Sequence, residues 1–179
     1  AVGEDIQPAA SWADAVISRA DHFLHAFESA EPDLNRVMAE LEEFRALGRA
    51  LPSVWPAEGK LTSGFGWRRN PFGRTWKFHS GIDIAGKRGT PIYSPARGTV
   101  ATISYNSGYG RMLEIDHGFG IKSIYAHCNS IRVREGDVVK RGDLVATIGN
   151  TGRSTGPHLH FELRLDGHPV DPMDYLPRE

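Results

Sequence analysis

Four histidines and one aspartate after residue 54 have the types and spacing of a metal-dependent hydrolytic site. The run His79-Ser80-Gly81-Ile82-Asp83 holds an imidazole and a carboxylate four residues apart. On an extended segment side chains alternate between two faces, so positions 79 and 83 share one face and Gly81 leaves the space between them open. Imidazole and carboxylate are both zinc ligands, and this segment is therefore a candidate for part of a metal site.

The second pair of histidines lies in His158-Leu159-His160. Polar and apolar residues alternate over residues 158–165, so both histidines project from the same side of a predicted strand. His127 follows the strand-like run 121–125. Three protein ligands with one open position are typical of a catalytic zinc, and histidine and carboxylate supply them without thiolate. Each motif alone is also compatible with an ordinary strand, and only their combination favours a metal.

The only cysteine, Cys128, excludes an intrachain disulfide and a thiolate-cluster metal site. It follows His127 directly, but consecutive strand residues point to opposite faces, so we interpret it as a small buried hydrophobic residue rather than a nucleophile. His117 precedes a glycine, and His168 lies in an Asp-Gly-His-Pro turn sequence. We expect both of these histidines in turns or at the surface.

The composition changes near residues 51–56 and predicts an N-terminal helical segment over residues 1–52 and a second domain over residues 53–179. After the change, short β-branched or alternating runs are separated by glycine-containing turns, which predicts a mainly β, compact antiparallel domain. No long helical pattern follows residue 54, which argues against a doubly wound α/β fold. The predicted strands cover residues 98–103, 112–115, 121–125, 144–148 and 158–163.

Residues 1–52 carry helical periodicity and predict an amphipathic hairpin or the end of a coiled coil, with a packing role. A second helix is expected to begin at Glu31-Pro32, because proline is tolerated in the first turn. His22 and His25 have a poor spacing for a two-ligand site and are expected at the surface. The first helix is predicted from Ser11, Trp12, Asp14, Val16, Phe23 and Phe27, and the second from Leu34, Val37, Leu41 and Phe44.

Charge and length limit the partners. The chain has 179 residues, with 21 Lys and Arg against 22 Asp and Glu and a net charge of −1, so no overall field favours nucleic acid. No apolar run reaches the roughly 18 residues of a membrane helix. Because the chain begins at Ala1 rather than Met, we expect a processed or trimmed piece. A membrane anchor in a missing N-terminal part and self-association through the helices remain open.

Several motifs, in this order, make residues 60 to 176 resemble the lysostaphin/LytM-type zinc endopeptidases of peptidoglycan. A set of ordered motifs is far more specific than any one of them. The motifs are Ser63-Gly64-Phe65-Gly66-Trp67-Arg68, Asn70-Pro71, His79-Ser80-Gly81-Ile82-Asp83, Gly89-Thr90-Pro91-Ile92, Tyr125-Ala126-His127 and the run from Gly149 to Glu162 that contains His158-Leu159-His160.

The resemblance implies a Zn²⁺ ion held by His79, Asp83 and His160, with His127 and His158 as the catalytic pair. It also implies hydrolysis of peptide bonds in bacterial peptidoglycan, in stem-peptide cross-links or glycine bridges, and a location in the cell envelope, periplasmic or extracellular. Relatives that lack these residues act as non-enzymatic activators of cell-wall amidases. All five residues are present here, so we expect an active enzyme.

The resemblance also suggests roles beside the metal. Arg68 matches a family position, and we expect Arg68 and Asn70 to contact substrate. Residues 70–77 and 150–155 have the composition of loops that form the walls of a cleft. Two imidazoles that are not ligands can transfer protons to the leaving amine and stabilise the oxyanion, and the sequence does not assign which does which.

Two other readings compete with an active peptidase. Residues 135–149 resemble the strand-turn pattern of biotinyl/lipoyl-type carrier modules, although no modifiable lysine lies at a symmetric hairpin tip. The stronger alternative is a metal-bearing wall-binding or regulatory protein whose cleft is occluded by the N-terminal helices. Zinc content and peptidoglycan turnover, with and without residues 1–52, separate these possibilities.

Overall fold

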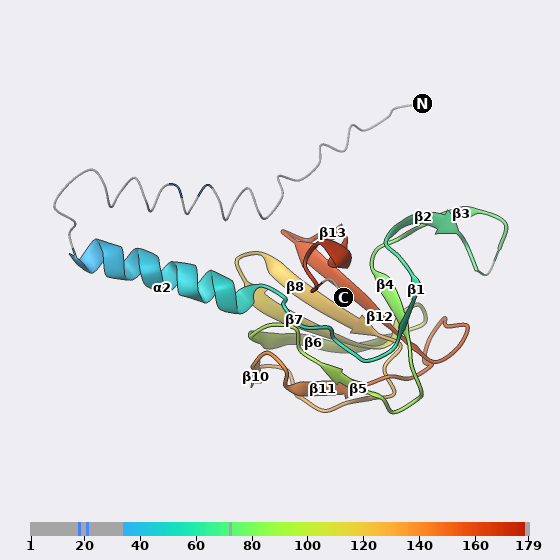
Figure 1. Ribbon diagram of the computed structural model, residues 1–179. Coiled ribbons are helices and arrows are strands. Elements are labelled where there is room, and N and C mark those ends of the chain that lie inside the picture. The colour runs from blue at the N-terminus through green and yellow to red at the C-terminus, as the bar shows by residue number, and fades with distance from the viewer. Residues whose placement is uncertain (1–17, 19–20, 22–33, 72, 178–179) are drawn as a thin grey trace. The chain divides into compact units, whose positions relative to one another are not determined.

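The computed structural model describes Ser18, Asp21 and residues 34–71 and 73–177 (Figure 1). The chain divides into two compact units, Ala1–Ala46 and Leu47–Glu179. Ser18 and Asp21 are helical. No helix within the described residues is both long and apolar enough to span a membrane. The predicted boundary between residues 52 and 53 stays a prediction.

Most of the predicted first helix lies outside the described residues. The apolar stripe and the cap predicted for this helix lie there, and so does the predicted start of the second helix. The predictions outside the described part concern Ser11, Trp12, Asp14, Val16, His22, Phe23, His25, Phe27 and Glu31-Pro32.

Helix α2 (Leu34–Ala50) forms from a segment rich in strong helix formers. Arg36 and Glu40 form an ion pair one turn apart, with 3.3 Å between Nε and Oε1. The last turn belongs to the second unit, where the Arg49 carbonyl accepts a hydrogen bond from the Arg97 backbone N–H at 3.0 Å. The side chain of Arg141 donates to the Gly48 carbonyl at 3.0 Å. The end of this helix is therefore part of the β domain.

Within the described residues, the second unit is built from antiparallel strands in three sheets, which confirms the predicted mainly β fold. The largest sheet has the order β1-β4-β12-β8-β7-β6-β10, with β13 paired to β12. Its strands are β1 (Lys60–Ser63), β4 (Ile82–Ala85), β12 (His158–Leu165), β8 (Ile121–Ala126), β7 (Gly110–Gly118), β6 (Gly98–Asn106), β10 (Val138–Val139) and β13 (His168–Val170).

Two smaller sheets complete the unit. One has the order β5-β11-β9, and the other is the two-stranded hairpin β2-β3, which projects from the main sheet in Figure 1. A short 3₁₀ helix near the C-terminus has its capping aspartate, Asp171, bonded to the Met173 N–H. The elements are β5 (Pro91–Tyr93), β11 (Leu144–Thr147), β9 (Ser130–Ile131), β2 (Gly66–Arg69), β3 (Trp76–His79) and η1 (Pro172–Asp174).

The core explains how the polar residues of β12 are placed. Leu159, Phe161 and Leu163 alternate along the strand and are almost fully buried, as the sequence pattern predicts. Each such side chain contributes about 1.5–3 kcal/mol of hydrophobic stabilisation on burial. On β4 the partners Ile84 and Ile82 lie opposite Leu159 and Phe161 and are equally buried. Because one face of β12 is buried in the core, the polar side chains between these residues must lie on the other face.

His79 and Asp83 meet for a different reason than the sequence suggested. They do not lie on one extended segment, because the chain bends at residues 80–81 between β3 and β4. Gly81 does not hold an open space between them. A Cβ atom there would lie 2.2 Å from the Phe161 carbonyl oxygen, so glycine is required for β12 to pass this close.

His117 corrects another expectation. It lies on β7 and is buried rather than in a turn or at the surface. Its Nδ1 donates to the Arg97 carbonyl at 2.8 Å, and its Nε2 is hydrogen-bonded to Ser123 Oγ at 2.8 Å. Burial lowers the pKa of His117, which keeps the ring neutral in this network. It is a structural histidine far along the sheet from the metal ligands predicted above.

The contact at Gly81 generates a stability prediction. Gly81→Ala forces the β4 and β12 backbones apart and is expected to lower the free energy of unfolding by about 2 kcal/mol or more. Urea unfolding of zinc-free protein measures this. The control is Gly48→Ala, where no atom lies within 4 Å of the added Cβ in a helix, and where the stability is expected to stay equal or rise. Equal stability of the two variants would contradict the close approach.

Candidate metal centre

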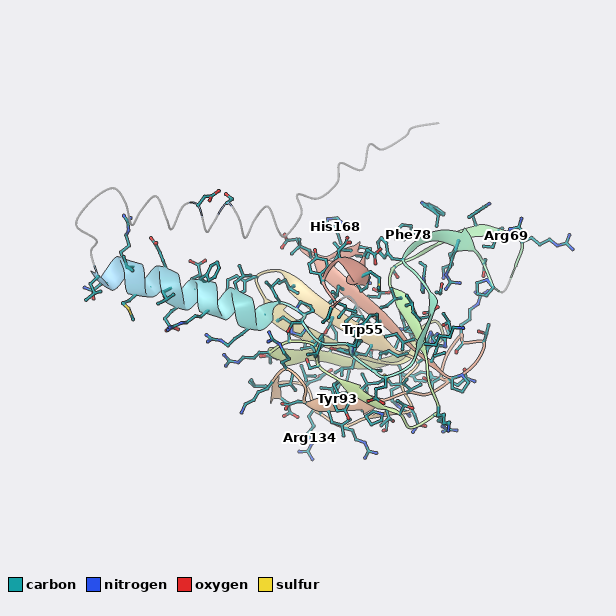
Figure 2. The ribbon with its side chains drawn as sticks, viewed as in Figure 1. Trp55, Arg69, Phe78, Tyr93, Arg134 and His168 are labelled. Carbon is teal, nitrogen blue, oxygen red and sulfur yellow. The ribbon has the colours of Figure 1, made fainter. Side chains whose placement is uncertain are left out.

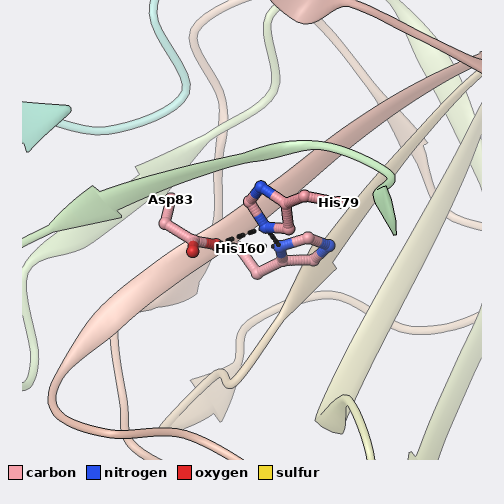
Figure 3. Close-up of side chains that lie close together, drawn as sticks. All are labelled: His79, Asp83 and His160. Carbon is pink, nitrogen blue, oxygen red and sulfur yellow. Dashed lines mark hydrogen bonds and ion pairs between the residues drawn. The ribbon is translucent and has the colours of Figure 1, made fainter. Parts of the chain in front are cut away.

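Three side chains that are far apart in the sequence converge on one point (Figure 3). His79 Nε2 lies 3.1 Å from Asp83 Oδ1 and 3.0 Å from His160 Nδ1. His160 Nδ1 lies 2.9 Å from Asp83 Oδ1. His160 and Asp83 are directly opposite in the β12–β4 register, and His79 comes from the end of β3. The structure therefore brings together the three predicted ligands, whose coordinating role stays a prediction.

Hydrogen bonds on the outer side of each ring orient the two imidazoles. His79 Nδ1 lies 2.7 Å from the Gly64 carbonyl oxygen, and His160 Nε2 lies 3.0 Å from Glu162 Oε1. Both acceptors require a proton on the nitrogen that faces them, so each neutral ring turns an unprotonated nitrogen toward Asp83, and only a doubly protonated ring donates a hydrogen bond to that carboxylate. Two nitrogen lone pairs and a carboxylate oxygen then face one another at about 3 Å. This arrangement attracts a cation.

The donor set fits zinc. Zinc binds imidazole nitrogen and carboxylate oxygen at about 2.0–2.2 Å, which places tetrahedral donors about 3.3 Å apart. The observed separations between the three donor atoms, 2.9 to 3.1 Å, differ from this by a few tenths of an ångström. His79 and His160 are buried, and the remaining side of the cluster opens into a cleft. His79, Asp83 and His160 are thus the residues that could hold the ion.

The electrostatics of Asp83 suit a ligand. Burial alone raises the pKa of its carboxyl, but hydrogen bonds and charge interactions with His160 and His79 outweigh burial and hold the pKa well below its usual value. The second carboxylate oxygen, Oδ2, accepts a hydrogen bond from Arg68 Nη2 at 3.2 Å. Asp83 is therefore ionised and fixed in orientation.

Glu162 is a functional residue that the sequence reasoning missed. It is fully buried on the same polar face of β12 as His160. Its Oε1 accepts hydrogen bonds from His160, from Ser80 Oγ at 2.6 Å and from the Tyr109 hydroxyl at 2.7 Å. Arg164 donates to Oε2 at 2.8 Å. Burial raises the pKa of Glu162, and these hydrogen bonds outweigh it and lower the pKa to about 2.

The signal for Glu162 was present in the sequence. Alternation over residues 158–165 puts it on the same face as both histidines, two residues beyond His160. An acid next to a ligand imidazole along a strand is a candidate for orienting that imidazole. The sequence did not reveal that Ser80 and Tyr109 donate hydrogen bonds to Glu162, because both come from distant segments of the chain.

His127 and His158 lie beside the ligand cluster, with ring centroids 4.7 Å apart. His127 Nδ1 lies 2.8 Å from the Thr151 carbonyl oxygen, and His158 Nδ1 lies 2.8 Å from the Gly156 carbonyl oxygen. Both rings therefore keep Nε2 unprotonated when neutral. Burial lowers the pKa of His127 to about 4, so this ring is neutral at pH 7. His158 Nε2 lies 3.7 Å from Asp83 Oδ1.

The backbone at His127 has an unusual conformation. Its φ is 60°, in a region that residues other than glycine rarely occupy. The His127 N–H donates to the Tyr109 carbonyl at 2.8 Å, which stabilises the turn at the end of β8. Such strained positions are concentrated at functional sites, where the surrounding structure holds them in place.

A cleft of about 410 Å³ opens over these residues. The predicted substrate contacts, Arg68 and Asn70, both line it, and Arg68 also binds Asp83 as described above. Lys77 and Arg153 come from the two segments that the sequence assigned to the cleft walls, although Lys77 lies on strand β3 rather than in a loop. The substrate-binding roles of Arg68 and Asn70 stay predictions.

Cys128 is separated from this cleft. Its side chain is fully buried in the hydrophobic core, and Sγ donates to the Tyr125 carbonyl at 3.6 Å. Burial raises the pKa of the thiol to about 12, so no thiolate is available near neutral pH. The environment matches that of a small hydrophobic residue.

An antiparallel β domain with a His/Asp/His cluster in a cleft and two further imidazoles beside it has the donor set that single-metal hydrolases use. Residues 77–172, more than half of the chain, match the Peptidase family M23 profile. The chain belongs to this family, which confirms the resemblance found in the sequence.

Over the aligned segments, two named relatives are about two fifths identical to this chain. The DD-carboxypeptidase/endopeptidase Mpg of Neisseria meningitidis serogroup B is 41% identical over 114 residues, covering 64% of this chain and 26% of the relative. The murein hydrolase activator NlpD of Escherichia coli is 40% identical over 125 residues, covering 69% of this chain and 31% of the relative. The chain thus spans about a quarter to a third of the length of these relatives.

Solved structures show the same fold. A zinc-containing peptidase from Vibrio cholerae is 38% identical with a TM-score of 0.65, covering 69% of this chain and 39% of the other. The catalytic domain of lysostaphin from Staphylococcus simulans is 28% identical with a TM-score of 0.59, covering 65% of this chain and 91% of the other.

The division into ligands and other histidines generates a prediction. His79→Ala or Asp83→Ala removes one of three donor atoms and is expected to abolish zinc retention, whereas His127→Ala is expected to keep about one zinc per chain. Elemental analysis after dialysis measures this. Equal loss of zinc in all three variants would show that the division is wrong.

Glu162 generates a second prediction. Glu162→Gln keeps the side-chain volume but removes the charge that orients His160, and it is expected to weaken zinc affinity about 10- to 100-fold. Titration against a competing chelator measures the affinity. The matched control is Glu114→Gln, since Glu114 pairs with Lys122 on the sheet outside the cleft and its loss is expected to leave the affinity unchanged. Unchanged affinity in Glu162→Gln would contradict the orienting role.

Proposed function

We propose that this chain is a zinc-dependent endopeptidase that hydrolyses peptide bonds in bacterial peptidoglycan, in stem-peptide cross-links or bridges. The single observation that carries the proposal is the set of three donor atoms at 2.9 to 3.1 Å from one another. Family membership and the names of relatives as a DD-endopeptidase and as a murein hydrolase activator support action on the cell wall. A place in the cell envelope, periplasmic or extracellular, follows from that substrate.

The chain's own residues account for binding and for proton movement. When bound, zinc acts as a Lewis acid and makes a hydrolytic nucleophile available at neutral pH. His127 and His158 have Nε2 free to accept a proton from the attacking water and to return one to the leaving amine. His127 is neutral at pH 7, so its Nε2 lone pair is available to the water or to the substrate. We assign proton transfer and oxyanion stabilisation to the two histidines jointly.

Basic side chains give the cleft a preference for acidic peptides. Arg68, Lys77 and Arg153 line the cleft, and stem peptides of peptidoglycan carry free carboxylates. Asn70 adds a donor and an acceptor for an extended peptide backbone. We propose Arg68 and Asn70 as substrate-binding residues on this basis.

Product analysis tests the proposed reaction. The zinc-loaded full chain is expected to cleave defined cross-linked muropeptides and to yield products that mass spectrometry identifies as hydrolysed at a single peptide bond. Chelation and His127→Ala are each expected to lower turnover at least about 100-fold, in the second case with zinc retained. Cleavage that survives removal of the metal would contradict the proposal.

A regulatory role is the second candidate, favoured by the 40% identity to a protein named as a murein hydrolase activator. Comparing the full chain with a version that starts at Leu47 separates the two functions. We choose this start because residues 48–51 bond to the β domain and belong to the second unit. Turnover only in the shorter version indicates occlusion by the N-terminal helices, and zinc without turnover in both indicates a regulator.

A further inference from the structure

The β2-β3 hairpin has two faces with different chemistry. In an antiparallel pair, residues directly opposite one another lie on the same face. Arg68 pairs with Lys77, and next to them His79 pairs with Gly66; Arg68, Lys77 and His79 all line the cleft. The alternate residues therefore form the opposite face of the same hairpin, which consists of Trp67, Arg69, Trp76 and Phe78.

We call Trp67, Trp76 and Phe78 the aromatic face. Trp67 is 69% exposed, Trp76 is 66% exposed and Phe78 is 37% exposed. The Trp67 and Phe78 rings are 5.7 Å apart at 76°, and Phe65 packs edge-on against Phe78 at 5.0 Å. These contacts hold Trp67 and Phe78 in place, and most of the Trp67 and Trp76 indoles stays accessible. Figure 2 labels Phe78 and Arg69 on this projecting hairpin.

Exposed aromatic rings gathered on one small hairpin indicate a binding surface, because single exposed apolar residues are ordinary but clusters are not. The charged residues of this segment are also all of one sign. Residues 64–79 contain four basic and no acidic residues, in a chain whose net charge is −1. Arg69 lies on the same face as the three aromatic rings, whereas Arg68 and Lys77 face the cleft, so the hairpin as a whole fits a partner that combines apolar ring faces with negative charge. The four basic residues are Arg68, Arg69, Arg74 and Lys77.

We propose that the aromatic face binds the glycan strand of peptidoglycan, forming a second subsite behind the wall of the metal cleft. This inference rests on the proposed function. The C–H faces of pyranose rings stack on indole rings, and carboxylates of neighbouring stem peptides complement the basic residues of the hairpin. The glycan strand with its attached stem peptides has both the sugar rings and the carboxylates.

The distances agree with this arrangement. A stem of four residues spans at most about 14 Å when extended, so the sugar that carries it lies within that distance of the cleft. A strand of four residues such as β2 is about 13 Å long. A glycan strand whose peptide enters the cleft is therefore within reach of the hairpin. An anionic membrane surface has the same chemistry. Only the glycan, however, is covalently attached to the peptide that we propose enters the cleft on the other face of the hairpin.

Binding to intact peptidoglycan sacculi tests the inference without requiring turnover. In the zinc-loaded full chain, Trp67→Ala/Trp76→Ala is expected to weaken cosedimentation with sacculi at least about fivefold, while Trp67→Phe/Trp76→Phe stays within about twofold of the unmodified chain. Tyr105→Ala, which removes an aromatic ring that is 67% exposed on β6, is the matched control and is expected to change nothing. Cleavage of sugar-free cross-linked peptides is expected to be unaffected by the double alanine variant.

The outcomes separate this inference from the proposed function. If the double alanine variant binds sacculi more weakly and the unmodified chain hydrolyses no peptide, the proposed enzyme activity is wrong and the subsite is supported. Peptide hydrolysis with unchanged sacculus binding in the double alanine variant would overturn the subsite and retain the enzyme. Loss of binding to phosphatidylglycerol vesicles with unchanged sacculus binding would overturn it in favour of a membrane surface.

Discussion

The pairing register between β12 and β4 is the constraint on which the site depends. It sets His160 directly opposite Asp83, and it sets Leu159 and Phe161 opposite two buried isoleucines. A slip of one residue would turn the apolar side chains toward solvent and His160 and Asp83 into the core, so burial of the apolar face enforces the register. The hydrophobic effect on its own is therefore enough to place this histidine and this carboxylate on the open face.

The resulting cluster needs positive charge, which bound protons or a metal ion can supply, and this is how structure leads to function. Hydrogen bonds at the outer nitrogens of His79 and His160 leave lone pairs facing an ionised carboxylate at about 3 Å. The buried Glu162 holds one of these rings, and it is itself held by three other side chains. A metal ion that relieves the repulsion stabilises the folded chain as it binds. The open side of the cluster faces the cleft, where the two remaining histidines lie.

Local alternation predicted the class of fold and the common face of the two β12 histidines, whereas the three residues of the cluster were predicted from the resemblance to the zinc endopeptidases. The common face of His158 and His160 follows from period two along a strand, and this part of the reasoning agrees with β12. The reasoning for His79 and Asp83 was wrong, since a bend at residues 80–81 separates them and tertiary pairing reunites them. His117 was misplaced for the same kind of reason. Its partners, Arg97 and Ser123, are visible only once β6, β7 and β8 are paired.

In the proposed site, one ion is held by two imidazoles and one carboxylate. X-ray absorption spectroscopy at the zinc edge, on the zinc-loaded full chain, measures this most directly. We expect light-atom neighbours at about 2.0–2.2 Å with outer-shell scattering from two imidazole rings. Scattering from sulfur near 2.3 Å, from no imidazole or from four imidazoles would contradict it.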